Sequence, residues 1–364
     1  WLWFMPLSLI AAGLFQAFNY WSTRRKQFRR LAVRQITQST VTAATQLGIG
    51  FAMRPGPGGL ISGSILGQLT ATGRLAWQIW KDEGKQLLAY IRRKDLYRVG
   101  IRFRKFPIYD SWSGLLNTAS TMLPALLLGY FFTPAIVGYY ALGHRVLSIP
   151  MGVIGGSIAQ AFFPRVAEAR RTGNIDKITL EMFQKLLAIG LVPMLLITIV
   201  APDLFALVFG SRWWTAGEYV RWLSLWLLFV FISSPLSSLF SVLERQKDSF
   251  LINVVQFTTR LAVLVIGGCL HNSHLTVAMF GAVSAILVIL TCLYIIILAG
   301  VSIKIVLKKT IEIAVGAIPY VVIPIIFKIS GTSSLILVLA SVLMGLIFVI
   351  KRVQRMLANN YNGI

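Results

Sequence analysis

Four arginines lie inside long apolar stretches of the chain, namely Arg74, Arg145, Arg221 and Arg260. A charge within a membrane span is costly and usually marks a functional site. A guanidinium also offers paired donors that suit phosphate and carboxylate oxygens. Arg145 and Arg260 lie deep in their stretches, so we expect them to face a cavity that binds an anion. The alternative is an internal ion pair or a carbonyl contact that fixes helix packing.

Arg74 and Arg221 lie near the ends of their stretches, where a long side chain reaches the lipid headgroups. We therefore expect both to be membrane-surface cations. Glu218 precedes Arg221 by less than one helical turn, which predicts a local ion pair.

Two further polar residues are candidates for the same cavity. His144 directly precedes Arg145 and shares its polar surroundings, either as a proton relay or as a packed side chain. Asp110 begins another apolar stretch, where it either couples transport to protons or cations or favours the positive end of a helix.

The sequence gives little support for a metal site or for catalysis. His271 and His274 near Cys269 provide too few ligands at matched spacing, so no metal site and no cofactor are predicted. The chain has no nucleophile elbow, phosphate-binding glycine loop, zinc-protease helix or paired-carboxylate motif. We therefore expect a protein that is not an enzyme.

The elements that hold these residues are membrane helices. Hydrophobic residues make up 56% of the chain and charged ones only 13%, against about 25% charged in soluble domains. This composition predicts an all-α integral membrane protein. Eleven stretches are long enough to span a bilayer, or nearly so: 1–21, 31–53, 59–80, 107–132, 135–163, 179–200, 215–241, 249–270, 276–300, 311–329 and 333–350.

The stretch 31–53 is half polar, with glutamine, serine and threonine at many positions. It is either an amphipathic surface helix or a span whose polar face lines a water-filled cavity. We favour a span, because removing it would spoil the alternation of the loops that follow.

The positive charge is distributed by loop. Most of the 35 lysines and arginines fall in alternate loops and in the tail after residue 350, whereas Arg54, Arg212 and Lys328 fall on the opposite side. This bias predicts a cytoplasmic C-terminus and accounts for most of the net charge of +23. Nucleic acid is therefore not expected as a partner, whereas anionic lipids are.

The number of predicted spans is odd, which suggests that further helices precede residue 1 in the full protein. A cytoplasmic tail and eleven crossings place residue 1 outside, so we expect a fragment that lacks an odd number of helices. The basic stretch 81–106 separates three spans from eight and predicts a joint between two lobes.

Several motifs carry a family resemblance. They are "RRKQFRRLAVRQITQSTVTAATQLGIGF", "GLISGSILGQLTATGRL", "TPAIVGYYALGHRVLSIPMG" and "AGEYVRWLSLWLLFVFISSPLSSLFSVLERQ". In order and spacing they resemble the bacterial Wzx-type oligosaccharide and polysaccharide flippases, which belong with multidrug and toxin extruders and the lipid II flippase. The resemblance weakens after about residue 300.

The resemblance implies two six-helix bundles around a central cavity. Residues 1–80 would be the last three helices of an incomplete first bundle, 81–106 a cytoplasmic linker, 107–300 the second bundle, and 301–364 two extra helices with the tail. Three helices would be missing at the front, which is the odd number that the parity requires.

The resemblance also implies a function. The protein would flip undecaprenyl-diphosphate-linked oligosaccharide across the bacterial cytoplasmic membrane by alternating access, for O-antigen or exopolysaccharide synthesis. A polysaccharide polymerase and a chain-length regulator would be its partners. The alternatives are an ion-coupled drug or toxin extruder of the same fold, and a membrane polymerase or glycosyltransferase that acts on lipid-linked glycans.

Overall fold

The computed structural model describes residues 5–25, 27–52, 57–90, 93–104 and 106–361. Every regular element in these ranges is a helix, which confirms the predicted all-α architecture. The chain divides into two compact units, Trp1–Phe103 and Arg104–Ile364.

The first unit contains α1 (Met5–Arg24), α2 (Phe28–Ala52), α3 (Pro57–Tyr90) and α4 (Arg93–Arg102). Helix α3 packs against both α1 and α2. A Cβ atom at Gly67 would lie 2.0 Å from the hydroxyl of Thr42, so the glycine permits the close approach of α2 and α3. The ion pair Arg25–Glu83, at 3.1 Å, ties the end of α1 to α3.

Helix α3 continues ten residues beyond the predicted end of its span at residue 80. The stretch 81–106, predicted as a linker, is therefore largely helical where it is described, through the end of α3 and through α4. Lys, Asp, Glu and Arg side chains crowd this part of the chain, and a helix that leaves the bilayer can continue in water with such residues.

Within the residues that the structure describes, the second unit contains eight helices that are long and apolar enough to cross a membrane. They agree with the last eight predicted spans. Helices α1–α3 form at the first three predicted positions but are not among these eight, since polar residues lower their hydropathy. Residues 1–4 of the first predicted span and residue 53 of the second lie outside the described residues. The crossings of α1–α3 therefore stay predictions.

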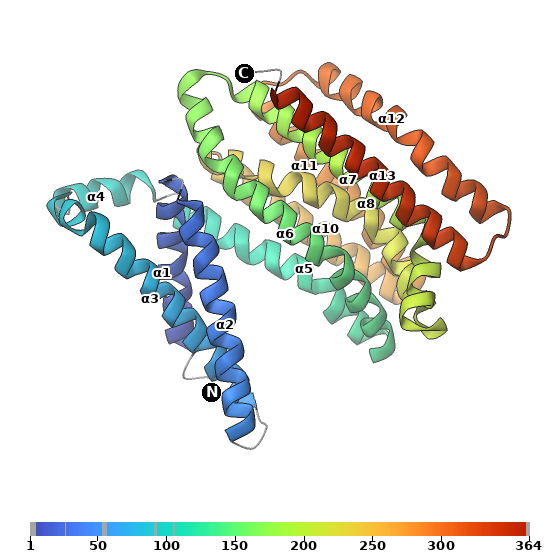
Figure 1. Cartoon of the computed structure of the whole chain (residues 1–364), viewed down its shortest axis with the longest axis horizontal. Helices are drawn as coiled ribbons and strands as arrows, with labels where there is room; N and C mark the ends of the chain where they lie inside the picture. The colour runs from blue at the N-terminus through green and yellow to red at the C-terminus, as the bar shows by residue number, and fades with distance from the viewer. Residues whose placement is uncertain (1–4, 26, 53–56, 91–92, 105, 362–364) are drawn as a thin grey trace. The chain divides into compact units, whose positions relative to one another are not determined.

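The elements of the second unit are, in order, η2 (Phe106–Asp110), α5 (Ser111–Phe131), α6 (Pro134–Thr172), α7 (Ile175–Phe209), η3 (Ser211–Trp213), α8 (Trp214–Leu236), α9 (Ser238–Val242), α10 (Gln246–Cys269), α11 (Ser273–Leu298), α12 (Ile303–Ile329) and α13 (Ser334–Tyr361). Helix α8 packs against α6, α7 and α11, while α10 packs against α5 and α11. Helices α12 and α13 lie side by side along α7 (Figure 1).

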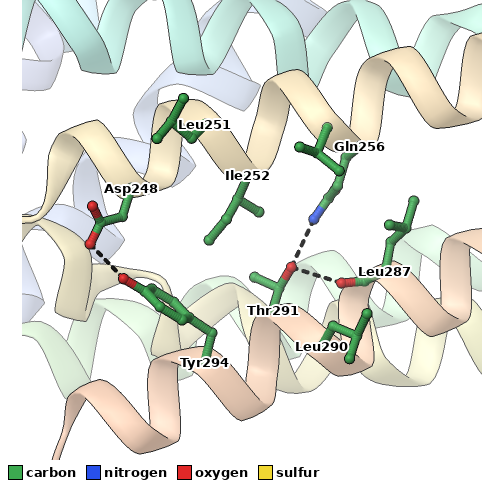
Figure 2. A pocket seen from close by; sticks show the side chains of 9 residues that line it. Asp248, Leu251, Ile252, Gln256, Leu287, Leu290, Thr291 and Tyr294 are labelled. Atoms are coloured by element: carbon green, nitrogen blue, oxygen red, sulfur yellow. Dashed lines mark hydrogen bonds between the residues drawn. The ribbon is translucent and has the colours of Figure 1, made fainter.

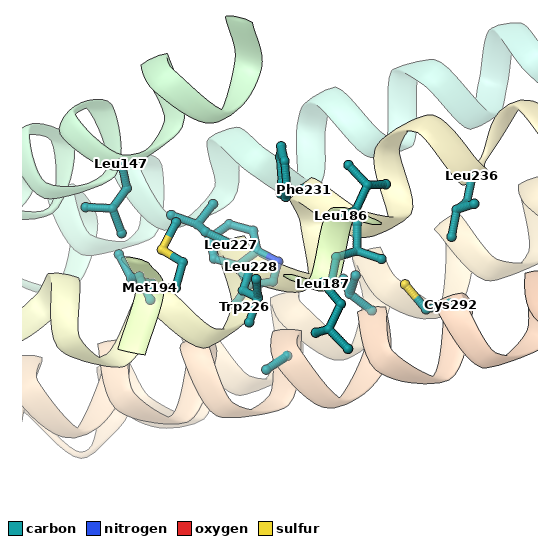
Figure 3. Close-up of a cluster of buried hydrophobic side chains, with 14 of the residues drawn as sticks. Leu147, Leu186, Leu187, Met194, Trp226, Leu227, Leu228, Phe231, Leu236 and Cys292 are labelled. Atoms are coloured by element: carbon teal, nitrogen blue, oxygen red, sulfur yellow. The ribbon is translucent and has the colours of Figure 1, made fainter. Parts of the chain in front are cut away.

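The hydrophobic core of this unit is centred on α8. Trp226, Leu228 and Phe231 are buried there among Leu186 and Leu187 of α7 (Figure 3). A Cβ atom at Gly281 would lie 2.4 Å from the carbonyl oxygen of Trp222, so only glycine allows α11 to approach α8 this closely. This close packing holds α8 and α11 together, and both helices line the polar cavity of this unit.

Candidate functional site

A polar cavity of about 480 Å³ lies within the second unit. Residues from α5, α6, α8, α9, α10 and α11 line it. Its polar side chains are Ser113, Asn117, Thr121, His144, Ser148, Ser233, Ser234, Ser237, Ser249, Asn253, Gln256, Arg260 and Thr291. The lining is therefore rich in hydroxyl and amide groups, and among the described residues Arg260 alone brings a full charge to it.

One face of α10 supplies four of these residues. Ser249, Asn253, Gln256 and Arg260 follow one another at intervals of four, three and four residues. Side chains at such intervals lie on one face of an α-helix. The helical period thus brings the cationic group and three neutral polar groups to the same wall of the cavity.

Hydrogen bonds between helices hold this wall in place. The Asn253 side-chain amide donates to the Ser113 hydroxyl at 2.7 Å, and the Ser113 and Ser249 hydroxyls are 3.2 Å apart. The Gln256 amide donates to the Thr291 hydroxyl at 3.0 Å. These contacts connect α10 to α5 on one side and to α11 on the other.

Arg260 is buried, with 2% of its surface exposed. Its Nε donates to the Ser284 hydroxyl at 3.1 Å and its Nη1 to the Ser120 hydroxyl at 2.9 Å. The guanidinium carbon lies 5.3 Å from the centre of the Trp226 ring. Within the described part of the chain it has neither a carboxylate partner nor a bond from Nη2. The cation is therefore solvated by neutral groups only and is not neutralised.

Trp226, which contacts this cation, belongs to a cluster of aromatic rings. The His144 ring stacks on Tyr140 at 5.8 Å and lies 5.9 Å from Trp226. The Tyr140 hydroxyl and the Trp226 Nε1 are buried and have no hydrogen-bond partner among the described residues. Buried polar groups are rarely left unpaired. The Tyr140 hydroxyl and the Trp226 N–H are therefore available to form hydrogen bonds with a bound ligand near Arg260.

The structure brings together two of the predicted cavity residues, Arg260 and His144. Arg145 is exposed and Asp110 is half-buried, and neither lines this cavity. Asp110 lies at the N-cap of α5 and makes no capping hydrogen bond through its side chain. The assignment of Arg145 and Asp110 to a substrate cavity stays a prediction.

The two arginines that were predicted to lie at the membrane surface both contact other side chains of this chain. Arg221 pairs with Glu218 at 3.0 Å, which confirms the predicted local ion pair. Arg74 is exposed and donates to the Thr37 hydroxyl at 3.0 Å. Their contact with lipid headgroups stays a prediction.

The sequence reasoning missed the neutral polar residues of α5, α8 and α10. The signal was present in the serine, asparagine and glutamine spacing along α10, which repeats with the helical period inside an apolar stretch. For metal binding, the described residues contain no group of three or more histidine, cysteine, aspartate or glutamate side chains that could hold an ion.

Comparison with known proteins identifies the family. The sequence profile of the family described as "Polysaccharide biosynthesis protein" matches residues 1–218. The chain belongs to this polysaccharide biosynthesis family. The part of the chain that matches the profile covers the whole first unit and the second unit as far as the start of α8, including His144. Arg260 lies beyond the matched region.

Two curated relatives share part of their length with this family member. It is 25% identical to the lipopolysaccharide biosynthesis protein WzxC of Escherichia coli over 193 residues, which cover 50% of this chain and 39% of the relative. It is 22% identical to the teichuronic acid biosynthesis protein TuaB of Bacillus subtilis over 215 residues, which cover 58% of this chain and 43% of the relative. The matches thus span about two-fifths of each relative.

The fold is that of a solved flippase. The lipid II flippase MurJ, in an inward closed conformation, matches 85% of this chain and 65% of its own with a TM-score of 0.58. Sequence identity is 14%, so this likeness concerns the fold. The polysaccharide biosynthesis family member is accordingly a multi-pass membrane protein with a flippase-like all-α fold.

Proposed function

We propose that this chain forms part of a transporter that moves undecaprenyl-diphosphate-linked oligosaccharide from the inner to the outer leaflet of the bacterial cytoplasmic membrane. The product serves cell-surface polysaccharide synthesis. The observation that carries the proposal is Arg260, a buried cation without a carboxylate partner in the described structure, on the wall of a hydroxyl-rich cavity.

The chemistry of the cavity fits such a substrate. A sugar exchanges its water for the hydroxyl and amide groups of the lining, and aromatic rings such as Trp226 suit its apolar faces. A diphosphate is doubly anionic, so a desolvated guanidinium binds it far more strongly than it would in water. The polyprenyl chain needs no polar surroundings, since it stays in hydrocarbon throughout.

Movement across the membrane needs no covalent step. The protein works by alternating access, in which the polar cavity opens to one leaflet at a time. Anionic lipids bind the basic loops on the cytoplasmic side, where the C-terminus lies. A polysaccharide polymerase and a chain-length regulator take up the product on the outer side.

An extruder of cationic drugs fits the cavity less well. Such a protein needs carboxylates to bind the cation, but the lining contains neither aspartate nor glutamate among the described residues. A polymerase or glycosyltransferase is disfavoured by the short loops between the last eight helices on the side predicted to face outward. The fold likeness to a flippase also supports transport rather than catalysis.

The test is deletion of the encoding gene in its host, followed by measurement of which leaflet holds the undecaprenyl-linked oligosaccharides. We expect completed units to accumulate on the cytoplasmic leaflet. The wild-type gene should relieve this block, whereas Arg260→Ala should not. Arg145→Ala, tested in parallel, decides whether this exposed arginine also contributes.

Two results would contradict the proposal. Units that reach the outer leaflet but stay unpolymerised would indicate a polymerase. Unchanged lipid-linked glycans together with new sensitivity to cationic drugs would indicate an extruder.

A further inference from the structure

His144 is a side chain of the polar cavity whose charge can change. It lies on α6, lines the cavity and is half-buried, and neither ring nitrogen has a hydrogen-bond partner among the described residues. An unperturbed imidazole gains a proton at about pH 6.5, and both of its nitrogens then donate hydrogen bonds. His144 can therefore serve as a neutral aromatic ring or as a cation.

Trp226 connects His144 to the buried arginine. The centre of its ring lies 5.9 Å from the centre of the His144 ring and 5.3 Å from the guanidinium carbon of Arg260. Tyr140 stacks on His144 at 5.8 Å, and its hydroxyl, like the Trp226 N–H, has no partner among the described residues. These four side chains thus form one cluster, with two basic groups and two neutral donors.

The charged residues of α5, α6 and α7 do not line this part of the cavity. Arg145 of α6 is exposed and Asp110 lies at the N-cap of α5, and neither is a lining residue. Helix α7 has no titratable side chain between Lys185 and Asp203. In the described structure, these helices therefore place no carboxylate in the cavity that would hold a proton on His144.

The charged residues of α8, α10 and α11 other than Arg260 also lie outside the cavity lining. Glu218 and Arg221 of α8 pair with each other at 3.0 Å. Asp248 of α10, twelve residues before Arg260, accepts a hydrogen bond from the Tyr294 hydroxyl of α11 at 2.6 Å (Figure 2). The other titratable side chains of these three helices, which do not line the cavity, are Tyr219, Lys247, Cys269, His274 and Cys292.

Two basic groups without a carboxylate suit an anion with two charges. In the empty cavity the positive charge of Arg260 disfavours a second cation nearby, whereas an anion bound beside both groups favours the protonated imidazole. We propose that His144 takes up a proton from the medium when the diphosphate of the substrate binds, so that His144 and Arg260 each neutralise one of its two negative charges. This inference rests on the proposed function of the cavity.

Such a pair would select the kind of linkage between lipid and sugar. A monophosphate that links the two has one negative charge, which Arg260 alone neutralises, whereas a diphosphate has two. The second charge is attracted more strongly in the cavity than it would be in water, because the surroundings are less polar. His144 thereby determines a preference for diphosphate-linked over monophosphate-linked glycans.

The preference depends on pH in a defined direction. Because the bound state holds one more proton than the free state, affinity for the diphosphate-linked lipid is highest below about pH 6.5 and decreases as the pH rises above this value. Neither phosphate linkage titrates in this range, so the dependence comes from the protein. The monophosphate-linked lipid, which does not need the second cation, shows no such dependence.

The experiment measures binding of undecaprenyl-diphosphate-linked and undecaprenyl-monophosphate-linked N-acetylglucosamine to the full chain in lipid nanodiscs. Wild type should bind the diphosphate lipid about tenfold more tightly at about pH 6 than at about pH 8. His144→Phe keeps a ring against Tyr140 and Trp226 but has no charge. It should bind the diphosphate lipid about tenfold more weakly at about pH 6, lose the pH dependence and bind the monophosphate lipid normally.

Two further variants separate charge from packing. His144→Lys keeps a cation across this pH range, so it should bind the diphosphate lipid equally well at both pH values. His274→Phe is the matched control, because His274 also contacts an aromatic ring, that of Tyr219 at 5.3 Å, but does not line the cavity. It should behave as wild type. Thermal unfolding checks each fold, and His144→Gln serves as a second neutral variant.

Two results would overturn the inference. A wild-type pH profile in folded His144→Phe or His144→Gln would show that another group takes up the proton. Equal weakening of both lipids in these variants would show that His144 only packs. The proposed function fails differently: a wild-type protein that binds neither lipid would reject it, whereas binding that requires Arg260 and ignores His144 would reject only the role of His144.

Discussion

Replacing Arg260 by methionine should lower the affinity for the substrate while leaving the stability of the fold almost unchanged. The substitution removes the guanidinium but keeps an unbranched side chain of similar length among Ser120, Ser284 and Trp226. Two hydrogen bonds to a charged group are lost, each contributing about 1.5–3 kcal/mol. The cost of holding a desolvated charge, which is also several kcal/mol, disappears at the same time. The free energy of unfolding should therefore change little.

Transport should respond very differently. Each hydrogen bond from the guanidinium to a phosphate oxygen contributes about 1.5–3 kcal/mol, so losing one of them lowers affinity about 10- to 100-fold. Arg260→Lys keeps the charge but loses the planar fork, and it should fall between wild type and Arg260→Met. The signature is therefore a large loss of transport at nearly constant stability.

The assay is transfer of a fluorescent undecaprenyl-diphosphate-linked oligosaccharide between leaflets of proteoliposomes, with the melting temperature measured on the same preparations. Arg212→Met is the control, because it removes an exposed cation that does not line the cavity. A fall in melting temperature of more than about 10 °C would show that Arg260 is structural. Normal transport by a folded Arg260→Met protein would refute the binding role.

Three further outcomes are expected. Asn253→Ala removes the amide that donates to the Ser113 hydroxyl and should lower stability by about 1–2 kcal/mol in denaturant unfolding, whereas no change would show that this α5–α10 hydrogen bond is dispensable. Gly281→Val should destabilise the second unit by more than about 3 kcal/mol or abolish its folding, because no side chain fits 2.4 Å from the Trp222 carbonyl, and a stable variant would contradict that packing. A double-mutant cycle with Asp203→Asn and Lys328→Met should give a coupling of about 0.5–1 kcal/mol for their 3.7 Å ion pair between α7 and α12, and additive effects would show that it contributes nothing.

The sequence was sufficient for the helices of the second unit. Eight stretches of suitable length and hydropathy form helices there, because backbone groups in hydrocarbon must be satisfied within each segment. It was less successful at their ends. Helices such as α6 and α7 extend past their apolar stretches, since hydropathy marks where lipid begins and not where hydrogen bonding stops.

The candidate site was predictable in part. Arg260 was identifiable from its depth in an apolar stretch, and the polar residues of α10 were identifiable from their helical spacing. The partners of Arg260 were not, because Ser120 and Ser284 lie 140 and 24 residues away along the chain. Whether a buried arginine is paired with a carboxylate or left among hydroxyl groups depends on which helices become neighbours.

Sequence alone therefore determined that α10 carries a polar stripe within an apolar helix. Only the tertiary structure decided that the stripe faces a cavity, whereas Val255 on the same helix is half exposed. The reason is that membrane helices have apolar residues both in their packed core and on their lipid-facing surface. Hydropathy gives both surfaces the same value, and only packing against α5 and α11 distinguishes them.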